Sequence, residues 1–203
     1  QVIDVALHEA VFNCMESLIP EYSAFGAVRE PAGSALPGIA PSNAYPCRDG
    51  WVLVAGNGDS IFKRLMATID RQDLADDAQL ADNAGRVARV AEIDAAIGTW
   101  TGQHSVAQVM ERLAAARVPA GKVYTAKDIA EDPHYQARGM LLQQQTRDGY
   151  SITVPGVVPK LSATPGTVRT SAPHLGDDTD AVLMDAGLTR EQIALLRGKG
   201  VIQ

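Results

Sequence analysis

A strand, a glycine turn and a helix follow one another within residues 49–69, and this unit constrains the fold more than any other stretch. Asp49 and Gly50 form a tight-turn pair, and the apolar run WVLVA at 51–55 predicts a short buried strand. A Gly-Asn-Gly turn ends this strand, and Asp59 or Ser60 is expected to cap the next helix. The apolar face of that helix comprises Phe62, Leu65, Met66 and Ile69. The unit predicts an α/β protein.

Helical spacing of apolar residues recurs elsewhere in the chain. Residues 2–19 predict a helix that ends at Pro20 and is buried on more than one side, because apolar residues occupy most of its circumference. Residues 82–100 predict another helix, and residues 118–124 predict a short strand. Capping boxes predict three further helix starts, at Ser105 with Gln108, Thr125 with Asp128, and Thr189 with Gln192.

Two stretches are rich in proline and glycine. Residues 26–46 contain four prolines and predict a long irregular segment, and such loops tend to be functional or mobile. Residues 162–176 predict an extended linker.

The C-terminal part combines extended and helical patterns. Residues 140–161 predict a hairpin around Asp148-Gly149, followed by a third extended piece at 157–161. Two helices are expected at 178–186 and 189–198, with Gly187 as the residue that ends the first of them.

The composition excludes several functions. The 203 residues carry a net charge of -6 with a pI of about 5.2, whereas nucleic acids and anionic membranes bind basic surfaces. No run of 18 apolar residues and no secretory signal is found, so a cytoplasmic protein is expected. Cys14 and Cys47 fit neither a disulfide framework nor a zinc pattern and are expected to be free and buried. The start at Gln1, without methionine, suggests a processed chain or a piece of a longer one.

Motifs that carry chemistry are incomplete. His8 and Glu9 begin like a zinc HExxH motif, but Phe12 stands in place of the second histidine. The Gly-Asn-Gly turn lacks the third glycine of a dinucleotide loop, so a structural turn is preferred to a phosphate cradle. The four histidines are interpreted as surface or capping residues. The sequence predicts no metal site.

Five stretches, taken in order, share the pattern of one protein family. They are residues 1–10 (QVIDVALHEA), the P-x-x-x-Y-x-x-x-D-G segment at 41–50, residues 51–65 (WVLVAGNGDSIFKRL), residues 117–140 and residues 173–202. Together they resemble class III CoA-transferases, the group that includes formyl-CoA transferase, carnitine-dehydratase-like proteins and α-methylacyl-CoA racemase. Asp178 stands where the family usually has a histidine.

The resemblance implies a fold. In this family a small α/β domain is inserted into a Rossmann-like large domain, and two chains interlock as linked rings. Residues 1–25 would then be a helix of the large domain, and residues 26–140 the small α/β domain. Residues 141–203 would form a hairpin, a linker and C-terminal helices that return to the large domain.

The resemblance also implies a chemistry. In the transferases an aspartate attacks the acyl-CoA thioester and forms an acyl-aspartyl anhydride, whereas the racemases use a His/Asp acid–base pair. The family's aspartate lies upstream of the segment that matches Gln1, so no catalytic residue is expected in this chain, which would be inactive alone. The implied partners are acyl-CoA, a carboxylate acceptor, and a homodimer or the missing N-terminal half. Coenzyme A thioester would be a substrate, and no cofactor would be bound permanently.

The resemblance places a substrate-proximal region at the irregular segment and the glycine turn. Its candidate residues are Gly33, Ser34, Gly38, Pro41, Tyr45, Gly56, Asn57 and Gly58. Three functions stay open: the C-terminal portion of an acyl-CoA:carboxylate CoA-transferase, part of an α-methylacyl-CoA racemase-type isomerase, or a non-catalytic dimerisation or binding module.

Overall fold

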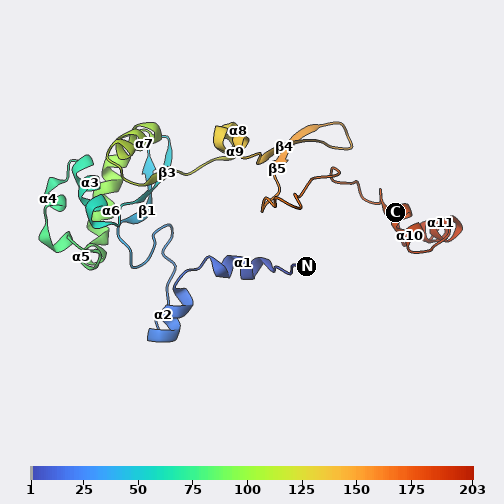
Figure 1. Ribbon diagram of the computed structural model, residues 1–203, viewed down its shortest axis with the longest axis horizontal. Helices are drawn as coiled ribbons and strands as arrows, with labels where there is room; N and C mark the ends of the chain where they lie inside the picture. The colour runs from blue at the N-terminus through green and yellow to red at the C-terminus, as the bar shows by residue number, and fades with distance from the viewer. Residues whose placement is uncertain (1) are drawn as a thin grey trace. The chain divides into compact units, whose positions relative to one another are not determined.

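The computed structural model describes residues 2–203, and the chain divides into two units (Figure 1). The first unit extends to Val123, and the second runs from Tyr124 to Gln203. Both units contain helices and strands, so the predicted α/β class is confirmed.

Three antiparallel strands form the sheet of the first unit, in the order β1-β2-β3. Strand β1 (Ser42–Cys47) pairs with β2 (Gly50–Ala55) across a tight turn, with Tyr45 opposite Val52. The short β3 (Ala120–Lys122) pairs with the other side of β2. The predicted strands within 51–55 and 118–124 are therefore confirmed.

All but the last residue of strand β1 lies inside the segment that the sequence predicts to be irregular, so this prediction is wrong for residues 42–46. Pro46 is tolerated because β1 is an edge strand, where a missing backbone N–H need not break the ladder. Strand β2 alternates: Val52 and Val54 are buried, whereas Trp51 and Leu53 are half exposed. The predicted burial of β2 thus holds for one face of the sheet only.

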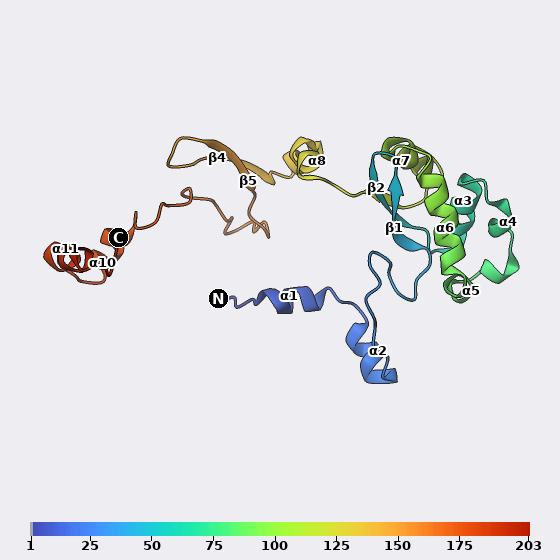
Figure 2. The same cartoon turned by 180° about the vertical axis from the view of Figure 1, so that it is seen from behind.

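Helices α3, α6 and α7 pack against the sheet, and they lie beside it in opposite views (Figures 1 and 2). Their bounds are Asp59–Thr68 for α3, Val90–Thr101 for α6 and Val106–Ala115 for α7. Between α3 and α6 run α4 (Gln72–Ala75), the 3-10 helix η1 (Ala78–Leu80) and α5 (Asn83–Ala88). The single helix predicted at 82–100 is therefore two helices, which meet at Arg89.

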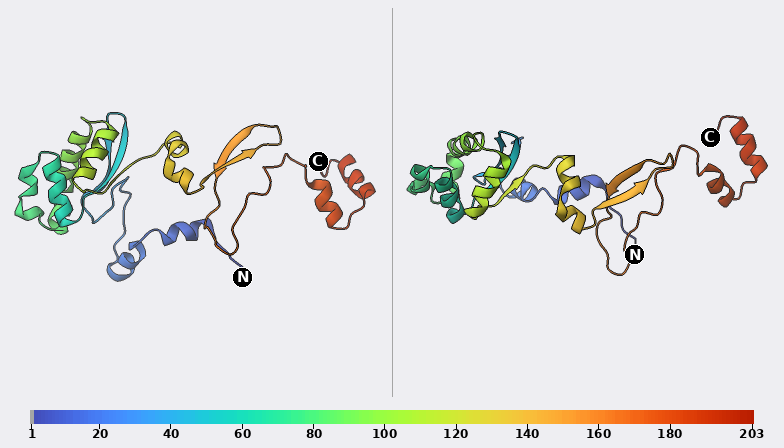
Figure 3. Two further views of the ribbon diagram at one scale, coloured as in Figure 1. Left: turned by 45° about the horizontal axis from the view of Figure 1, so that its top comes forward. Right: turned by 90° about the horizontal axis from the view of Figure 1, so that it is seen from above.

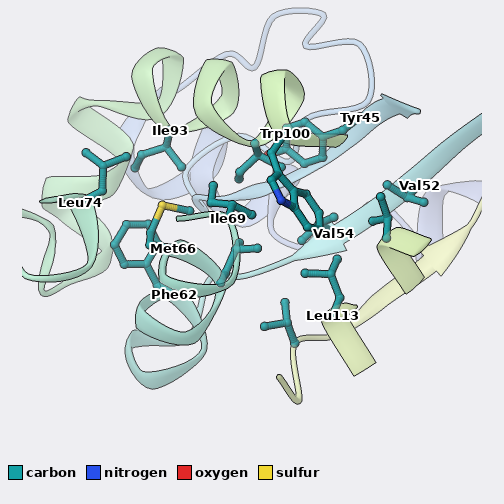
Figure 4. Packing of buried hydrophobic residues seen from close by; sticks show 14 of the residues in the cluster. Tyr45, Val52, Val54, Phe62, Met66, Ile69, Leu74, Ile93, Trp100 and Leu113 are labelled. Atoms are coloured by element: carbon teal, nitrogen blue, oxygen red, sulfur yellow. The ribbon is translucent and has the colours of Figure 1, made fainter. Parts of the chain in front are cut away.

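The hydrophobic core lies between this sheet and these helices. Figure 4 shows side chains from both pointing toward one another, among them Val52, Val54, Phe62, Met66, Ile69, Ile93, Trp100 and Leu113. The predicted apolar face of α3 is confirmed, since all four of its residues are buried. The predicted cap is wrong by one residue, because Gly58 is the N-cap and Asp59 begins the helix.

The N-terminal segment contains two short helices, α1 (Leu7–Asn13) and α2 (Leu18–Phe25), instead of one continuous helix. Glu16 has a φ of 52°, which breaks the helical path. Pro20 lies in the first turn of α2, where its missing N–H costs no hydrogen bond. The predicted burial is not found: neither helix has a buried residue, and Leu7 is 89% exposed.

The two cysteines are unpaired, as predicted. Cys14 is exposed, so the prediction of a buried thiol is wrong at this position. Cys47 at the end of β1 is partly buried. Cys47 is less exposed than Cys14 because it packs against the core of the first unit.

Glu21 in α2 is expected to titrate well below the normal range of a glutamate. Arg29 donates from Nε to its Oε2 at 2.8 Å, and the Ser17 hydroxyl donates to its Oε1 at 2.7 Å. These bonds, with that of Arg29 the stronger, lower the pKa of Glu21 from 4.5 to about 2. Because folding lowers this pKa, the stabilisation is complete above pH 4.5 and is lost as the pH falls toward 2. NMR titration of the Glu21 carboxyl carbon measures this midpoint.

Arg29→Gln should return the Glu21 midpoint toward 4.5. Arg48→Gln is the matched control, because the Arg48 guanidinium binds Gln108 on α7 instead. A low midpoint that persists in Arg29→Gln would show that this arginine is not the cause.

The second unit begins with two short helices, α8 (Ala126–Glu131) and α9 (Pro133–Ala137). The predicted capping box of Thr125 with Asp128 opens α8. Asp132 caps α9, which the sequence does not predict, by accepting from the backbone N–H groups of two following residues.

A hairpin follows, with β4 (Leu141–Gln145) paired to β5 (Ser151–Pro155), so the predicted hairpin is confirmed. The third extended piece expected at 157–161 is not a strand. Residues 162–176 contain neither helix nor strand, in agreement with the predicted linker.

The last two helices, α10 (Thr179–Asp185) and α11 (Arg190–Gly198), lie side by side (Figure 3). Gly187 has a φ of 93° and follows α10, and Thr189 opens α11 with its capping box, both as predicted. Among the described residues of this unit, Ile193 is the one fully buried apolar side chain. Nowhere in residues 2–203 does a helix have the length and apolar character needed to cross a membrane.

Candidate functional site

Arg86 on α5 is completely buried and connects the irregular segment to the glycine turn. Its Nε donates to the carbonyl of Ala40 at 3.0 Å, and its Nη1 donates to the carbonyl of Leu80 at 3.1 Å. Its Nη2 donates to the carbonyl of Asn57 and to the carboxylate of Asp59, both at 2.8 Å. A buried guanidinium is stable only with such partners, and here three segments of the chain supply them.

Asn83 lies one turn before Arg86 on the same face of α5. Its side-chain oxygen accepts from the N–H of Ala40 at 3.1 Å, and its side-chain nitrogen donates to the carbonyl of Gly38 at 2.9 Å. Asn83 and Arg86 therefore hold residues 38–40 by hydrogen bonds to the backbone, both to an N–H group and to carbonyl groups.

The irregular segment and the glycine turn meet at Pro41 and Gly56. The Gly56 N–H donates to the Pro41 carbonyl at 3.0 Å. A Cβ on Gly56 would lie 2.5 Å from Leu65 Cδ2 and 3.0 Å from Pro41 Cγ, so a side chain here would force its neighbours to move. Glycine permits this close approach.

A second cluster forms around Asp94 on α6. Its carboxylate accepts from the Tyr45 hydroxyl at 2.6 Å and from the Asn43 side-chain nitrogen at 3.0 Å. The Ser34 hydroxyl donates to the side-chain oxygen of Asn43 at 2.7 Å. Burial, followed by the contact with Asp94, raises the pKa of Tyr45 and keeps its hydroxyl protonated as a donor. The cluster fixes the irregular segment to β1 and α6.

A hollow of about 410 Å³ lies beside this second cluster. Its lining includes Ser34, Ser42, Asn43, Leu53, Pro119 and Gly121. Two hydroxyl groups and an amide thus lie within a mainly apolar lining, with the Ser34 hydroxyl and the Asn43 amide already hydrogen-bonded within the protein. This size and this chemistry suit part of a small organic substrate.

The eight predicted substrate-proximal residues fall into two groups and one outlier. Around Arg86 and Asn83 lie Gly38, Pro41, Gly56, Asn57 and Gly58. Beside Asp94 and Asn43 lie Ser34 and Tyr45. Gly33 has a φ of 63° and makes no hydrogen bond to either group in the described chain. The side chain of Asn57 is exposed, and its carbonyl oxygen joins the first group.

The side chains that hold these residues together were not predicted from the sequence; they are Asn43, Asn83, Arg86 and Asp94. One signal was available for Arg86. It precedes Ile93 by seven residues and so falls on the apolar face predicted for residues 82–100. An arginine on such a face indicates a buried charge with several partners.

The arrangement can orient main chain and a small molecule. Burial, with Asp49 as a smaller cause, raises the pKa of the Cys47 thiol, which makes it a poor nucleophile. Among residues 2–203, no three histidine, cysteine, aspartate or glutamate side chains are grouped so that they could hold a metal ion. That the chain itself carries no catalytic residue stays a prediction.

The family follows from comparison with known proteins. The sequence profile of CoA-transferase family III matches residues 1–179, which is most of the chain. The chain belongs to this family, and the resemblance seen in the sequence is confirmed.

Relatives and solved structures agree with this assignment. The chain is 40% identical, over its whole length, to succinyl-CoA–D-citramalate CoA-transferase of Chloroflexus aurantiacus, of which it covers 51%. It is 36% identical to the beta subunit of succinyl-CoA–L-malate CoA-transferase of the same organism, again covering 51%. The chain thus spans about half the length of the curated relatives it matches.

The fold is similar to that of a CAIB/BAIF family protein from Brucella suis, with a TM-score of 0.71 and 28% identity. That likeness covers 91% of this chain and 48% of the Brucella chain. The Mycobacterium tuberculosis protein Rv3272 has the same fold, with a TM-score of 0.65 at 18% identity over 89% of this chain and 47% of the other.

Proposed function

We propose that the chain is the C-terminal portion of an acyl-CoA:carboxylate CoA-transferase. The observation that carries this is the 40% identity, along all of the chain, to half of a protein named as a CoA-transferase. The relatives named above are transferases rather than racemases, so transfer is the activity proposed.

The proposed substrates follow from the names of those relatives. Both are named for succinyl-CoA as one substrate, and citramalate and malate are hydroxy-dicarboxylates. We propose a dicarboxylic acyl-CoA as donor and a hydroxy-dicarboxylate as acceptor. The coenzyme A thioester is then consumed as a substrate, and no resident cofactor takes part.

The proposed division of labour leaves the nucleophile outside this chain. An aspartate upstream would attack the thioester carbonyl, and the C–S bond would break with release of the CoA thiolate. This chain would supply the loop, the glycine turn and the hollow that hold the reacting ends in place. Gly33, Ser34, Gly38, Pro41, Tyr45, Gly56, Asn57 and Gly58 are its proposed substrate-proximal residues.

The proposed protein partners are the N-terminal half and a second subunit. The relatives include proteins named as alpha and beta subunits, which supports assembly with another chain. The exposed apolar residues of α1 and α2 support a contact with further protein, because large apolar patches mark such interfaces. The unpaired cysteines are in keeping with the reducing cytoplasm.

The test compares this chain alone with the natural polypeptide that joins it to its upstream sequence. Each is incubated with succinyl-CoA and either malate or citramalate, and the new CoA ester is separated by chromatography. We expect transfer by the joined polypeptide and a rate at least about 10⁴-fold lower for the chain alone, the scale on which loss of a nucleophile acts. Turnover by the chain alone would overturn its status as an inactive portion. Epimerisation of an α-methylacyl-CoA without transfer, or no turnover by the joined polypeptide, would overturn the transferase itself.

A further inference from the structure

We propose that Arg86, together with Asn83, is a positioning residue that sets the distance between residues 38–41 and the glycine turn at 56–58. This inference rests on the proposed function, because these two segments are the proposed substrate-proximal region. Neither side chain would touch substrate. Their effect would pass through the main chain that they hold.

Arg86 bridges the two segments directly. Its Nε binds the Ala40 carbonyl at 3.0 Å and its Nη2 binds the Asn57 carbonyl at 2.8 Å. The guanidinium is planar and presents its N–H groups in fixed directions. The separation of these two carbonyls is therefore set by the shape of one side chain.

The Arg86 side chain that forms this bridge has little freedom to move. Arg86 is 0% exposed, and its Cζ lies 5.2 Å from the centre of the Phe62 ring. Asn83 adds two bonds to residues 38–40 from the same face of α5. The bond from Gly56 to the Pro41 carbonyl closes the arrangement at 3.0 Å.

The segment that Arg86 and Asn83 hold leads directly into the lining of the hollow. Ser42 and Asn43 line the hollow and follow Pro41 directly. A shift of residues 38–41 would therefore move the start of β1 and the Ser34 hydroxyl bonded to Asn43. Small displacements of groups that orient reactants lower the rate strongly.

The test uses Arg86→Lys in the natural polypeptide that contains this chain. Lysine keeps the positive charge but is a point donor without the planar fork, so it cannot span both carbonyls. Arg64→Lys is the matched control. Arg64 also donates to three backbone carbonyls, those of Ser60, Ala116 and Arg117, but these lie on α3 and after α7.

Hydrogen exchange reads the positioning itself, whether or not the protein proves to be a transferase. Arg86→Lys should speed exchange of the Ala40 and Gly56 amides, while the Ala55 amide, bonded to Pro119, stays protected. Arg64→Lys should leave the Ala40 and Gly56 amides unchanged. Unchanged exchange at these amides in Arg86→Lys, or equally faster exchange throughout the sheet, would overturn the proposal.

Steady-state kinetics with succinyl-CoA and malate or citramalate then measures the effect of the substitution on the rate of transfer. Arg86→Lys should lower kcat by about 100-fold, the effect of misplacing a reacting group by about 1 Å, with a smaller change in KM. Arg64→Lys should retain the kcat of the unchanged protein. A local gain in exchange with an unchanged kcat would overturn the role in positioning. Absence of transfer in the unchanged protein would count against the proposed function and leave the exchange result to stand by itself.

Discussion

Arg86→Leu is expected to lower the free energy of unfolding of the first unit by about 2–6 kcal/mol, because two buried backbone carbonyls lose their hydrogen-bond donor. The substitution leaves the buried carbonyls of Ala40 and Leu80, and the partly buried carbonyl of Asn57, without their donor. Each carbonyl that is deprived of its partner and still buried costs about 1–3 kcal/mol. Leucine also cannot replace the volume of the longer side chain. Urea unfolding followed by the fluorescence of the two tryptophans measures the change.

Asp59→Asn is the matched control for Arg86→Leu. The Asp59 side chain is 67% exposed, so its ion pair with Arg86 lies largely in water on the carboxylate side. Exposed pairs contribute about 0–1 kcal/mol, and the change should stay within that range. If Asp59→Asn destabilised the unit as much as Arg86→Leu, the charge pair rather than the main-chain contacts would hold the arginine.

Gly85→Ala is expected to destabilise the same unit by about 3 kcal/mol, the upper end for overpacking of a well-packed site. A Cβ at residue 85 would lie 1.7 Å from the backbone oxygen of Gln79. A backbone atom cannot rotate away as a side chain can, so η1 and the start of α5 must separate. The contact between the Gly85 N–H and the Asp82 carboxylate, at 2.9 Å, would be strained in the same movement.

Gly98→Ala is the control, and it is expected to change the stability in the opposite direction to Gly85→Ala. Gly98 lies within α6, and a Cβ there would meet no atom within 4 Å. Alanine is favoured over glycine in a helix by about 1 kcal/mol, so this variant should be as stable as the unchanged protein or more stable. Thermal unfolding by circular dichroism compares the two variants. Equal midpoints would contradict the predicted clash at residue 85.

Local signals in the sequence predicted the parts of the fold that are determined locally. The capping boxes at Ser105, Thr125 and Thr189 open helices where they were expected, because the cap and its partner lie three residues apart. The hairpin around Asp148-Gly149 follows for the same reason, since turn chemistry fixes the pairing of its strands.

Features that depend on distant partners were missed or misplaced. Strand β1 exists because β2 offers it an edge, although its own sequence contains a proline. The contact between Arg86 and Ala40 joins residues 46 positions apart, and no local sequence pattern predicts it. In the candidate site, the glycines and Pro41 were predicted from a family pattern, and their role stays a prediction. Of the side chains that hold them, Arg86 had a signal in its place on an apolar helix face, whereas Asn43, Asn83 and Asp94 had none.

Because Arg86 contacts backbone carbonyls, it can hold the path of a loop without fixing which side chains the loop carries. Its carbonyl partners belong to Ala40, Asn57, Leu80 and Ala81, and a backbone carbonyl offers the same acceptor whatever side chain its residue carries. Packing constrains the buried side chains of Ala40 and Leu80, so this freedom applies to Asn57. The exposed side chain of Asn57 is free to vary in this sense. A loop held in this way can acquire new side-chain chemistry while its path through space stays the same.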